Sequence, residues 1–359
     1  MTVDLDKLLT TVVETGGSDL HLTVGRPPVV RMHGRLRSLN TPDLTAGDTE
    51  ALVAKLAPEK NLAELAECGT SDFAIAFGDK GRFRVSIFRQ KDHLGAACRL
   101  IPNGLLTFEQ IGLPQKAKEL LDSPRGLILV TGPTGSGKTT TLATMLDYIN
   151  ETFDRHIITI EDPIEYYHDH KKSVVMQREV GHDVASFAEA LRRALRQDPD
   201  VILLGEMRDN ETISTAITAA ETGHLVFGTL HTTGAARTVD RIIDSFPHEQ
   251  QDQIRAQLAV SLVAVISQVL MPRAGGKGRV AAFEILMSTP AVENHIRKNE
   301  TFKIPSVIQT SRKMGMVRLD DHIIELYEEG AIDKETAFEY CMSRSDLALK
   351  LGGANGDGA

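Results

Sequence analysis

The sequence feature that most constrains the fold is a glycine-rich phosphate-binding loop that fits the pattern G-x-x-x-x-G-K-[ST]. Its residues are Gly132, Pro133, Thr134, Gly135, Ser136, Gly137, Lys138 and Thr139. An apolar run at 127–130 precedes the loop, and a helical pattern at 140–148 follows it. Because such a loop joins a buried strand to a helix, the motif and its context predict an α/β domain with a nucleotide phosphate at one edge of its sheet.

The residue types in the loop suit phosphate chemistry. Glycines let backbone N–H groups converge on phosphate oxygens without Cβ clashes, and the following helix adds its positive dipole end. We expect Lys138 to reach the β and γ phosphates, the hydroxyl of Thr139 to bind Mg²⁺, and Thr140 to belong to the nucleotide-binding set. The alternative is a glycine-rich turn without a ligand, which the complete pattern disfavours.

Carboxylates follow two other apolar runs. The run 201–204 ends in Gly205 and Glu206, so glycine stands where a metal-side aspartate is usual. Glu206 is therefore predicted to orient or activate the attacking water. Glu161 and Glu165 come directly after another run and are further catalytic candidates. We assign Glu165 to the metal beside Thr139, although the residues alone leave open which of the two glutamates faces the ion.

Histidines and arginines supply the remaining candidates. The apolar strand within 222–232 has a histidine at each end. His224, at its start, is interpreted as structural, whereas His231, at the ligand end, is predicted to sense the γ-phosphate or to bridge to Glu206. Arg84 and Arg99 lie on strand-like runs near the N-terminus. Taken alone, these arginines indicate only a solvated basic sheet face.

The pattern of apolar and polar residues divides the chain into segments. Residues 1–102 show the short alternating strands of an α+β domain with a mostly antiparallel sheet, and 103–125 reads as a linker with a short helix. Continuous apolar strands alternate with helices over 126–288, as in a parallel sheet covered on both faces. A helical segment at 289–351 and a disordered glycine-rich tail at 352–359 complete the prediction.

Bulk properties limit the class of protein. The formal net charge of −9 does not favour nucleic-acid binding, and the three cysteines lack disulfide or zinc spacing. The start of the chain lacks a signal-peptide core, which favours a cytoplasmic location. The most apolar helical candidate, Leu258–Val269, contains polar residues and is predicted to be a buried helix rather than a membrane span.

Four sequence motifs, in their order along the chain, resemble those of the secretion-type hexameric ATPases, most closely the type IV pilus retraction ATPases. They are the phosphate loop, an Asp box at 158–165, an atypical Walker B at 203–209 in which Gly205 is the usual residue, and a His box at 222–231. The opening 17–22 is also similar, so the resemblance covers nearly the whole chain.

The resemblance implies a RecA-like P-loop ATPase domain preceded by a PAS-like N-terminal domain, with ATP and Mg²⁺ between the two. It implies a homo-hexamer that is peripheral to the membrane and acts on an inner-membrane pilus platform protein. Arg84 and Arg99 match the family's phosphate-contacting arginines, which raises them above the solvated-face interpretation.

Three alternatives stay open. The segment 291–298 departs from the retraction type, which leaves room for an accessory retraction ATPase. A nucleic-acid translocase is the second alternative, because Arg192, Arg193 and Arg196 on one helix could line a pore. The third is a nucleotide-binding switch with negligible turnover, against which the intact Glu206 argues.

Overall fold

The computed structural model describes residues 4–32, 35–101, 104–276 and 278–353. The chain divides into two compact units. Unit 1 comprises Met1–Gly104 together with Pro163–Tyr167, and unit 2 comprises Leu105–Asp162 and His168–Ala359.

Unit 1 is an antiparallel six-stranded sheet with helices packed on it. In sheet order the strands are β3 (Arg35–Ser38), β2 (Val29–Met32), β1 (Gly17–Leu22), β6 (His93–Ile101), β5 (Arg82–Gln90) and β4 (Thr70–Ala76). The helices are α1 (Leu5–Glu14), α2 (Ala46–Leu56), α3 (Glu59–Cys68) and the 3₁₀ turn η1 (Gly78–Lys80). Alternating residues of the strands are buried against these helices, so the predicted α+β class of this part is confirmed.

Unit 2 is built on a seven-stranded sheet in which every neighbouring pair is parallel except β12 with β13. In sheet order the strands are β13 (Arg279–Met287), β12 (Leu262–Pro272), β7 (Gly126–Thr131), β11 (Leu225–Leu230), β10 (Val201–Leu204), β8 (His156–Glu161) and β9 (Val174–Glu179). The central strands β7, β11 and β10 are buried along their whole length, which explains their uninterrupted apolar sequences.

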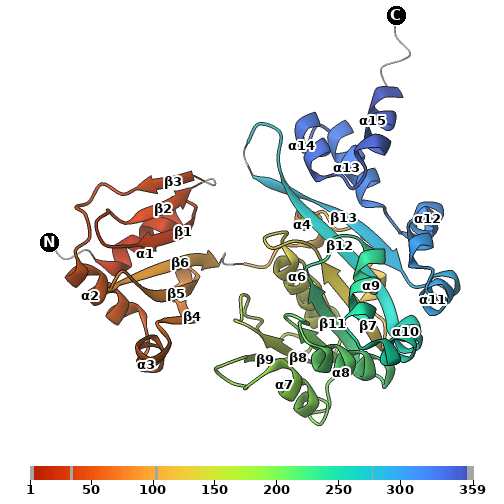
Figure 1. Ribbon diagram of the computed structural model, residues 1–359, viewed down its shortest axis with the longest axis horizontal. Coiled ribbons are helices and arrows are strands. Elements are labelled where there is room, and N and C mark those ends of the chain that lie inside the picture. The colour runs from red at the N-terminus through yellow and green to blue at the C-terminus, as the bar shows by residue number, and fades with distance from the viewer. Residues whose placement is uncertain (1–3, 33–34, 102–103, 277, 354–359) are drawn as a thin grey trace, which may run out of the picture. The chain divides into compact units, whose positions relative to one another are not determined.

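Helices cover both faces of this sheet, as Figure 1 shows. One face packs against α7 (Phe187–Ala194), α8 (Asn210–Glu221), α9 (Ala235–Asp244) and α10 (His248–Ser261). The other packs against α6 (Lys138–Thr152), α4 (Phe108–Ile111) and α5 (Ala117–Leu120). The side chains of Phe108 and Leu121 are buried there, so the stretch after residue 104 is part of the core of unit 2.

The prediction of a buried helix at Leu258–Val269 is wrong. Helix α10 ends at Ser261, and the next eleven residues form β12, parallel to β7. The strand is buried on both faces, so it lacks the alternation that marks a half-buried strand. Its valines and isoleucine, which favour strands, carried the missed signal.

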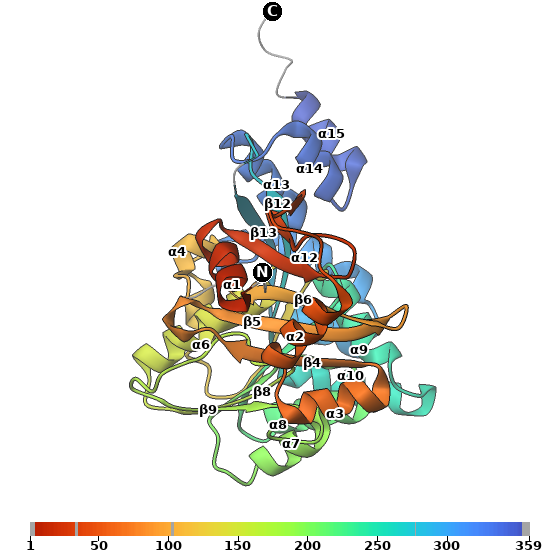
Figure 2. The ribbon, with the colours of Figure 1, turned by 90° about the vertical axis from the view of Figure 1, so that its left-hand side faces the viewer.

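The remaining helices follow β13. They are α11 (Pro290–Arg297), α12 (Ile304–Thr310), α13 (Leu319–Glu328), α14 (Lys334–Tyr340) and α15 (Arg344–Gly353), with the 3₁₀ turns η2 (Thr301–Lys303) and η3 (Arg312–Met314). Helices α13 to α15 pack around the far ends of β12 and β13, as Figure 2 shows. The predicted disordered tail, 352–359, lies outside the described residues except where α15 runs to Gly353. None of the described helices is long and apolar enough to cross a membrane.

Candidate nucleotide-binding and catalytic site

The phosphate loop joins β7 to α6, and its conformation requires glycine. Gly132, Gly135 and Gly137 have φ of 145°, 80° and 89°, which side chains rarely adopt. A Cβ on Gly132 would lie 2.2 Å from the carbonyl oxygen of Gln268 on β12. The backbone is therefore drawn tightly against the neighbouring strand, and only glycine fits at the first position of the motif.

The other loop residues are arranged around the first turn of α6. Pro133, Thr134 and Gly135 are exposed, whereas Ser136 is buried. Gly137, Lys138, Thr139 and Thr140 are half-buried at the start of the helix. The ammonium of Lys138 donates to the carbonyl oxygens of Gly132 (2.8 Å) and Pro133 (3.2 Å), so it lies across the concave side of the loop.

A side chain that the sequence analysis did not assign braces this loop. Gln268 is 1 % exposed on β12 and donates from Nε2 to the carbonyl oxygen of Ser136 at 2.5 Å. Its Oε1 accepts from the hydroxyl of Thr141 on α6 at 2.8 Å. One amide therefore ties the loop and the first turns of its helix to the adjacent strand. The available signal was the polar pair Ser267 and Gln268 inside an apolar run.

Glu206 lies just beyond the carboxyl end of β10, where open α/β sheets place reactive groups. Its Oε1 is 3.0 Å from Nε2 of His231, which follows β11, and 2.6 Å from Nε of Arg208. The hydrogen bond from Arg208 is the largest influence on Glu206 and, with His231, lowers the pKa of its carboxyl despite partial burial. The predicted contact between His231 and Glu206 is present, and Arg208 is an addition.

The close approach of β8 explains why glycine, and not the usual aspartate, stands at position 205. A Cβ at this position would lie 3.3 Å from both the Cα of Glu161 and the carbonyl oxygen of Ile160. That spacing is tighter than ordinary van der Waals contact, so a side chain would push β10 away from β8. The neighbouring strands thus approach closely at the point where Glu206 begins.

The two other glutamates have different surroundings. Glu161 is 8 % exposed at the end of β8, and its Oε1 accepts from the hydroxyl of Thr159 (2.6 Å) and from Gln177 of β9 (3.1 Å). Glu165 belongs to the short segment 163–167 that is grouped with unit 1 and is half-buried. Oε1 of Glu161 therefore links β8 to β9 within unit 2, and the assignment of Glu165 to the metal stays a prediction.

The candidate arginines of unit 1 are direct neighbours. Arg84 on β5 and Arg99 on β6 occupy opposite positions in the antiparallel pair, and both are exposed. Arg99 donates from Nε to Asp19 of β1 at 2.8 Å. Although burial alone would raise it, the hydrogen bonds from Arg99 and Ser18 lower the pKa of Asp19 overall. Arg84 and Arg99 form a small cationic face with one carboxylate beside it.

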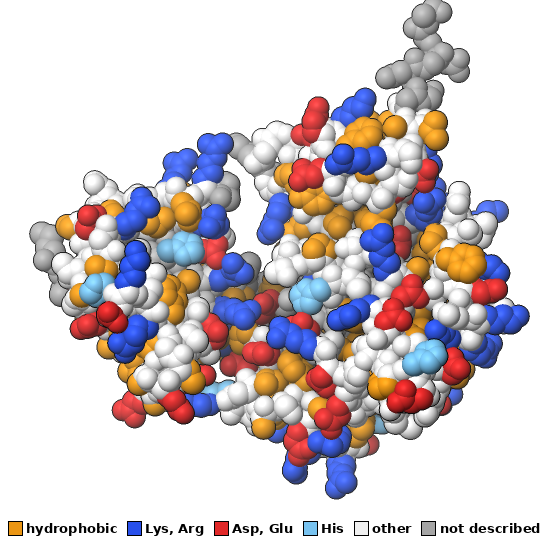
Figure 3. All heavy atoms as spheres, viewed as in Figure 1, with side chains coloured by type: hydrophobic (Ala, Val, Ile, Leu, Met, Phe, Trp, Pro, Cys, Tyr) orange, Lys and Arg blue, Asp and Glu red, His pale blue; other side chains and the backbone are white. Residues whose placement is uncertain are grey.

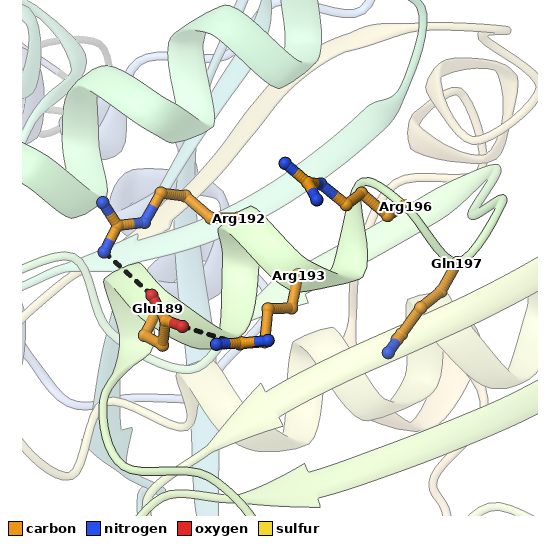
Figure 4. A pocket seen from close by; sticks show the side chains of 5 residues that line it. All are labelled: Glu189, Arg192, Arg193, Arg196 and Gln197. Atoms are coloured by element: carbon orange, nitrogen blue, oxygen red, sulfur yellow. Dashed lines mark hydrogen bonds and ion pairs between the residues drawn. The ribbon is translucent and has the colours of Figure 1, made fainter.

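Of the three arginines of the translocase alternative, Arg192 and Arg193 lie on α7, whereas Arg196 lies in the turn after the helix and not on it as predicted. They line an open hollow of about 500 Å³ with Glu189 and Gln197, and charged side chains gather over this part of unit 2 (Figure 3). Figure 4 shows Glu189 between Arg192 and Arg193, with ion pairs of 2.9 and 2.6 Å. Arg192 also pairs with Glu211 at 3.0 Å. These pairs reduce the positive charge available to a polyanion.

Comparison with known proteins decides the family. The sequence profile of the family described as "Type II/IV secretion system protein" matches residues 1–333. This chain belongs to that family. It is 50 % identical to the "Type IV pilus retractation ATPase PilT" of Pseudomonas aeruginosa, over 94 % of this chain and 98 % of the relative. It is 41 % identical to the "Type IV pilus ATPase PilU" of the same organism, over 97 % of this chain and 91 % of the relative.

A solved structure agrees with the sequence comparison. The crystal structure of "the Pilus Retraction Motor PilT and Bound ADP" has a TM-score of 0.89 and 47 % identity to this chain, covering 97 % of this chain and 99 % of that one. Membership of the type II/IV secretion family therefore extends through both units of the chain. The RecA-like core preceded by an α+β domain, as predicted, is the fold of this family member.

Proposed function

We propose that this chain is a subunit of an ATP-hydrolysing motor that powers type IV pilus retraction. The observation that carries the proposal is the contact between Glu206 and His231 at the ends of β10 and β11, because β11 pairs directly with β7, the strand that leads into the phosphate loop. Binding and hydrolytic groups thus share one edge of one sheet. The 50 % identity to a retraction ATPase, against 41 % to PilU, supports retraction over the accessory role.

The loop residues fit a nucleoside triphosphate. The positive φ values at Gly135 and Gly137 turn successive N–H groups toward one concave side, and α6 presents its N-terminus there. Lys138 exchanges its two carbonyl contacts for the β and γ phosphate oxygens when ATP enters. ATP is the ligand that this cradle is proposed to hold.

Mg²⁺ fits the same site through few protein ligands. Within the described residues no group of three or more His, Cys, Asp or Glu side chains could hold a metal, which suits an ion bound mainly by phosphate and water. The hydroxyl of Thr139 and the carboxylate of Glu165 are the proposed protein ligands. When bound, Mg²⁺ neutralises charge that develops on the phosphates.

Glu206 is the proposed group that orients the attacking water. Arg208 and His231 both contact its Oε1, so the carboxylate is ionised and held in one orientation. Oε2 then has a fixed position from which to accept a hydrogen bond from water. Glu161 supports this arrangement by tying the end of β8 to β9.

Membership of the family supports a proposal for the larger assembly. We propose a homo-hexamer at the cytoplasmic side of the inner membrane, in which Arg84 and Arg99 close over bound phosphates. Closure in successive subunits deforms the ring and drives a pilus platform protein in the membrane. The ion pairs of Arg192 and Arg193 argue against the alternative of a nucleic-acid translocase.

The test is steady-state ATP hydrolysis by the purified protein with Mg²⁺, with the oligomer mass measured on the same sample. We expect turnover by a hexamer, loss of nucleotide binding in Lys138→Ala, and a fall in kcat of at least about a hundredfold with retained ATP binding in Glu206→Gln. A Glu206→Gln protein with the wild-type kcat would remove Glu206 from the mechanism.

Expression in cells that lack their retraction ATPase distinguishes the motor from the accessory retraction ATPase. Restored twitching supports the motor, whereas restoration only alongside a second retraction ATPase indicates the accessory role. A well-formed ring with negligible hydrolysis, alone and with its membrane partner, would indicate a nucleotide-binding switch.

A further inference from the structure

The β12–β13 hairpin lies between the nucleotide-binding elements and the C-terminal helices of unit 2. On one side β12 pairs with β7, which leads into the phosphate loop. At the far ends, Val269 and Ala282 of the two strands pack against Leu319 and Ile323 of α13. The hairpin therefore contacts both the phosphate-loop strand and α13.

The turn that follows His231 is fastened to this hairpin. The backbone N–H of Gly234 donates to the hydroxyl of Ser267 on β12 at 2.8 Å. The next N–H, that of Ala235, donates to Oε1 of Glu284 on β13 at 2.7 Å. Ser267 and Glu284 are directly opposite each other in the hairpin. The last residue of the turn and the first residue of α9 are thus held by one cross-strand pair.

The second oxygen of Glu284 reaches the C-terminal helices. Oε2 accepts from the N–H of Leu319, the first residue of α13, at 3.4 Å. Ala235 likewise begins α9. Gly234 has no side chain and Arg318 has no acceptor, so neither can cap the helix that follows it. Glu284 therefore acts as a shared cap for α9 and α13. Burial raises the pKa of this carboxyl overall, and the two N–H groups at the helix starts oppose that shift.

A neighbouring contact joins the same two elements. The N–H of Phe283 donates to Nδ1 of His322 on α13 at 3.0 Å. Burial lowers the pKa of His322, so the ring is neutral and Nδ1 can accept. Helix α13 is thus held to β13 at Phe283 as well as at Glu284, so a displacement of α13 acts directly on this carboxylate.

The turn also reaches the active site through other groups. The hydroxyl of Thr238 on α9 lies 2.7 Å from that of Thr232 and 3.4 Å from that of Thr131, the last residue of β7. His231, one residue before Thr232, contacts Glu206. A shift of α9 at its first residue therefore reaches both His231 and the start of the phosphate loop.

We propose that Glu284 is a positioning residue that couples the C-terminal helices to catalysis, because it binds the turn carrying His231 with one oxygen and the start of α13 with the other. The inference rests on the proposed ATPase function. Only a carboxylate satisfies both donors. A glutamine offers one acceptor, and its NH₂ group would face the N–H of the second helix.

The decisive variant is Glu284→Gln in the full-length protein, with Asp320→Asn as its matched control. Asp320 is also a buried carboxylate in the C-terminal helices and accepts from two N–H groups, those of Met342 (2.6 Å) and Ser343 (3.0 Å). Both changes leave partly buried N–H donors unsatisfied and lower Tm. Only Glu284→Gln breaks the connection between α13 and α9.

We expect Glu284→Gln to lower kcat about tenfold, the effect of losing one well-placed hydrogen bond, with the Kd for a fluorescent ADP within about twofold of wild type. Hydrogen exchange should rise over 231–238. Asp320→Asn should keep the wild-type kcat. A wild-type kcat in Glu284→Gln, or equal losses in both variants, overturns the coupling.

Ser267→Ala keeps the proposal testable if Glu284→Gln does not fold. It removes the neighbouring bond to Gly234 without changing charge, so we expect the same separation of kcat from Kd, at a smaller size. A wild-type kcat in Ser267→Ala, with Glu284→Gln unfolded, also overturns the coupling. Absence of hydrolysis by the wild-type protein would instead refute the proposed function itself.

Discussion

Among the single residues of the site, Glu206 has the contacts that most limit the role its side chain can play. Its side chain is 20 % exposed and meets a guanidinium and an imidazole on the same oxygen. Because Arg208 follows two residues later, the carboxylate and its cation are positioned by one short turn after β10. The sequence predicted His231 as a partner from its place at a strand end, whereas no periodic pattern distinguishes Arg208 from an ordinary solvated arginine.

The role of Arg208 leads to a prediction about pH. Its hydrogen bond is the largest influence lowering the pKa of Glu206. Removing the guanidinium in Arg208→Ala raises that pKa toward the ordinary glutamate value. Since Glu206 must be ionised to orient water, the acid limb of the profile of kcat/KM against pH should move to higher pH.

The control for this prediction is Arg312→Ala, which removes another exposed arginine paired with a glutamate, Glu325. That profile should coincide with the wild-type profile. An acid limb that stays in place in Arg208→Ala would mean that Arg208 does not govern the protonation of Glu206.

At the scale of elements, some strands around the site can be predicted from their sequences and one cannot. Strands β7, β10 and β11 were predicted from apolar runs bounded by turn residues. Strand β12 was mistaken for a continuation of α10, because a strand buried on both faces shows no alternation and the helix before it ends without a glycine or proline. Because of this error, Gln268 was not assigned to the site from the sequence, since its importance depends on β12 lying beside β7.

Gln268 provides a test of this pairing. In Gln268→Glu one oxygen still accepts from Thr141, but the other faces the carbonyl oxygen of Ser136 in place of a donor. The loop must then move or leave a buried carboxylate unsatisfied, so we expect the Kd for ADP to rise about tenfold or more, measured by fluorescence titration.

A matched control for this change lies near the C-terminal end of α6. Asn150 is fully buried and its amide donates to the carbonyl oxygen of Asp169 at 2.7 Å while accepting from the N–H of Lys171. Asn150→Asp is the same amide-to-carboxylate change away from the phosphate loop. It should lower Tm without weakening ADP binding. An unchanged Kd in Gln268→Glu would show that the loop does not depend on this brace.

At the scale of the whole molecule, each unit has its own core and the proposed reaction needs both. Unit 2 contains the phosphate loop and Glu206, while Arg84 and Arg99 lie on the sheet of unit 1. The sequence predicted the α+β and α/β classes because their strand patterns differ in period. It could not predict that Arg84 and Arg99 are direct neighbours, since that depends on the β5–β6 register.

The Arg84–Arg99 pair gives opposite expectations for stability and activity. Like charges directly opposite on adjacent strands destabilise a sheet, by roughly 0.2–1 kcal/mol, and Asp19 offsets this only for Arg99. Arg84→Ala should therefore keep or slightly raise Tm, while kcat falls, by up to about 10³-fold if the guanidinium contacts the transferring phosphate. Arg89→Ala removes another exposed arginine of β5 from the end of the strand and should retain the wild-type kcat. A destabilised Arg84→Ala with undiminished kcat would reverse both expectations and assign Arg84 to the structure of unit 1. A stable variant with little turnover would support the proposed contact between Arg84 and the transferring phosphate.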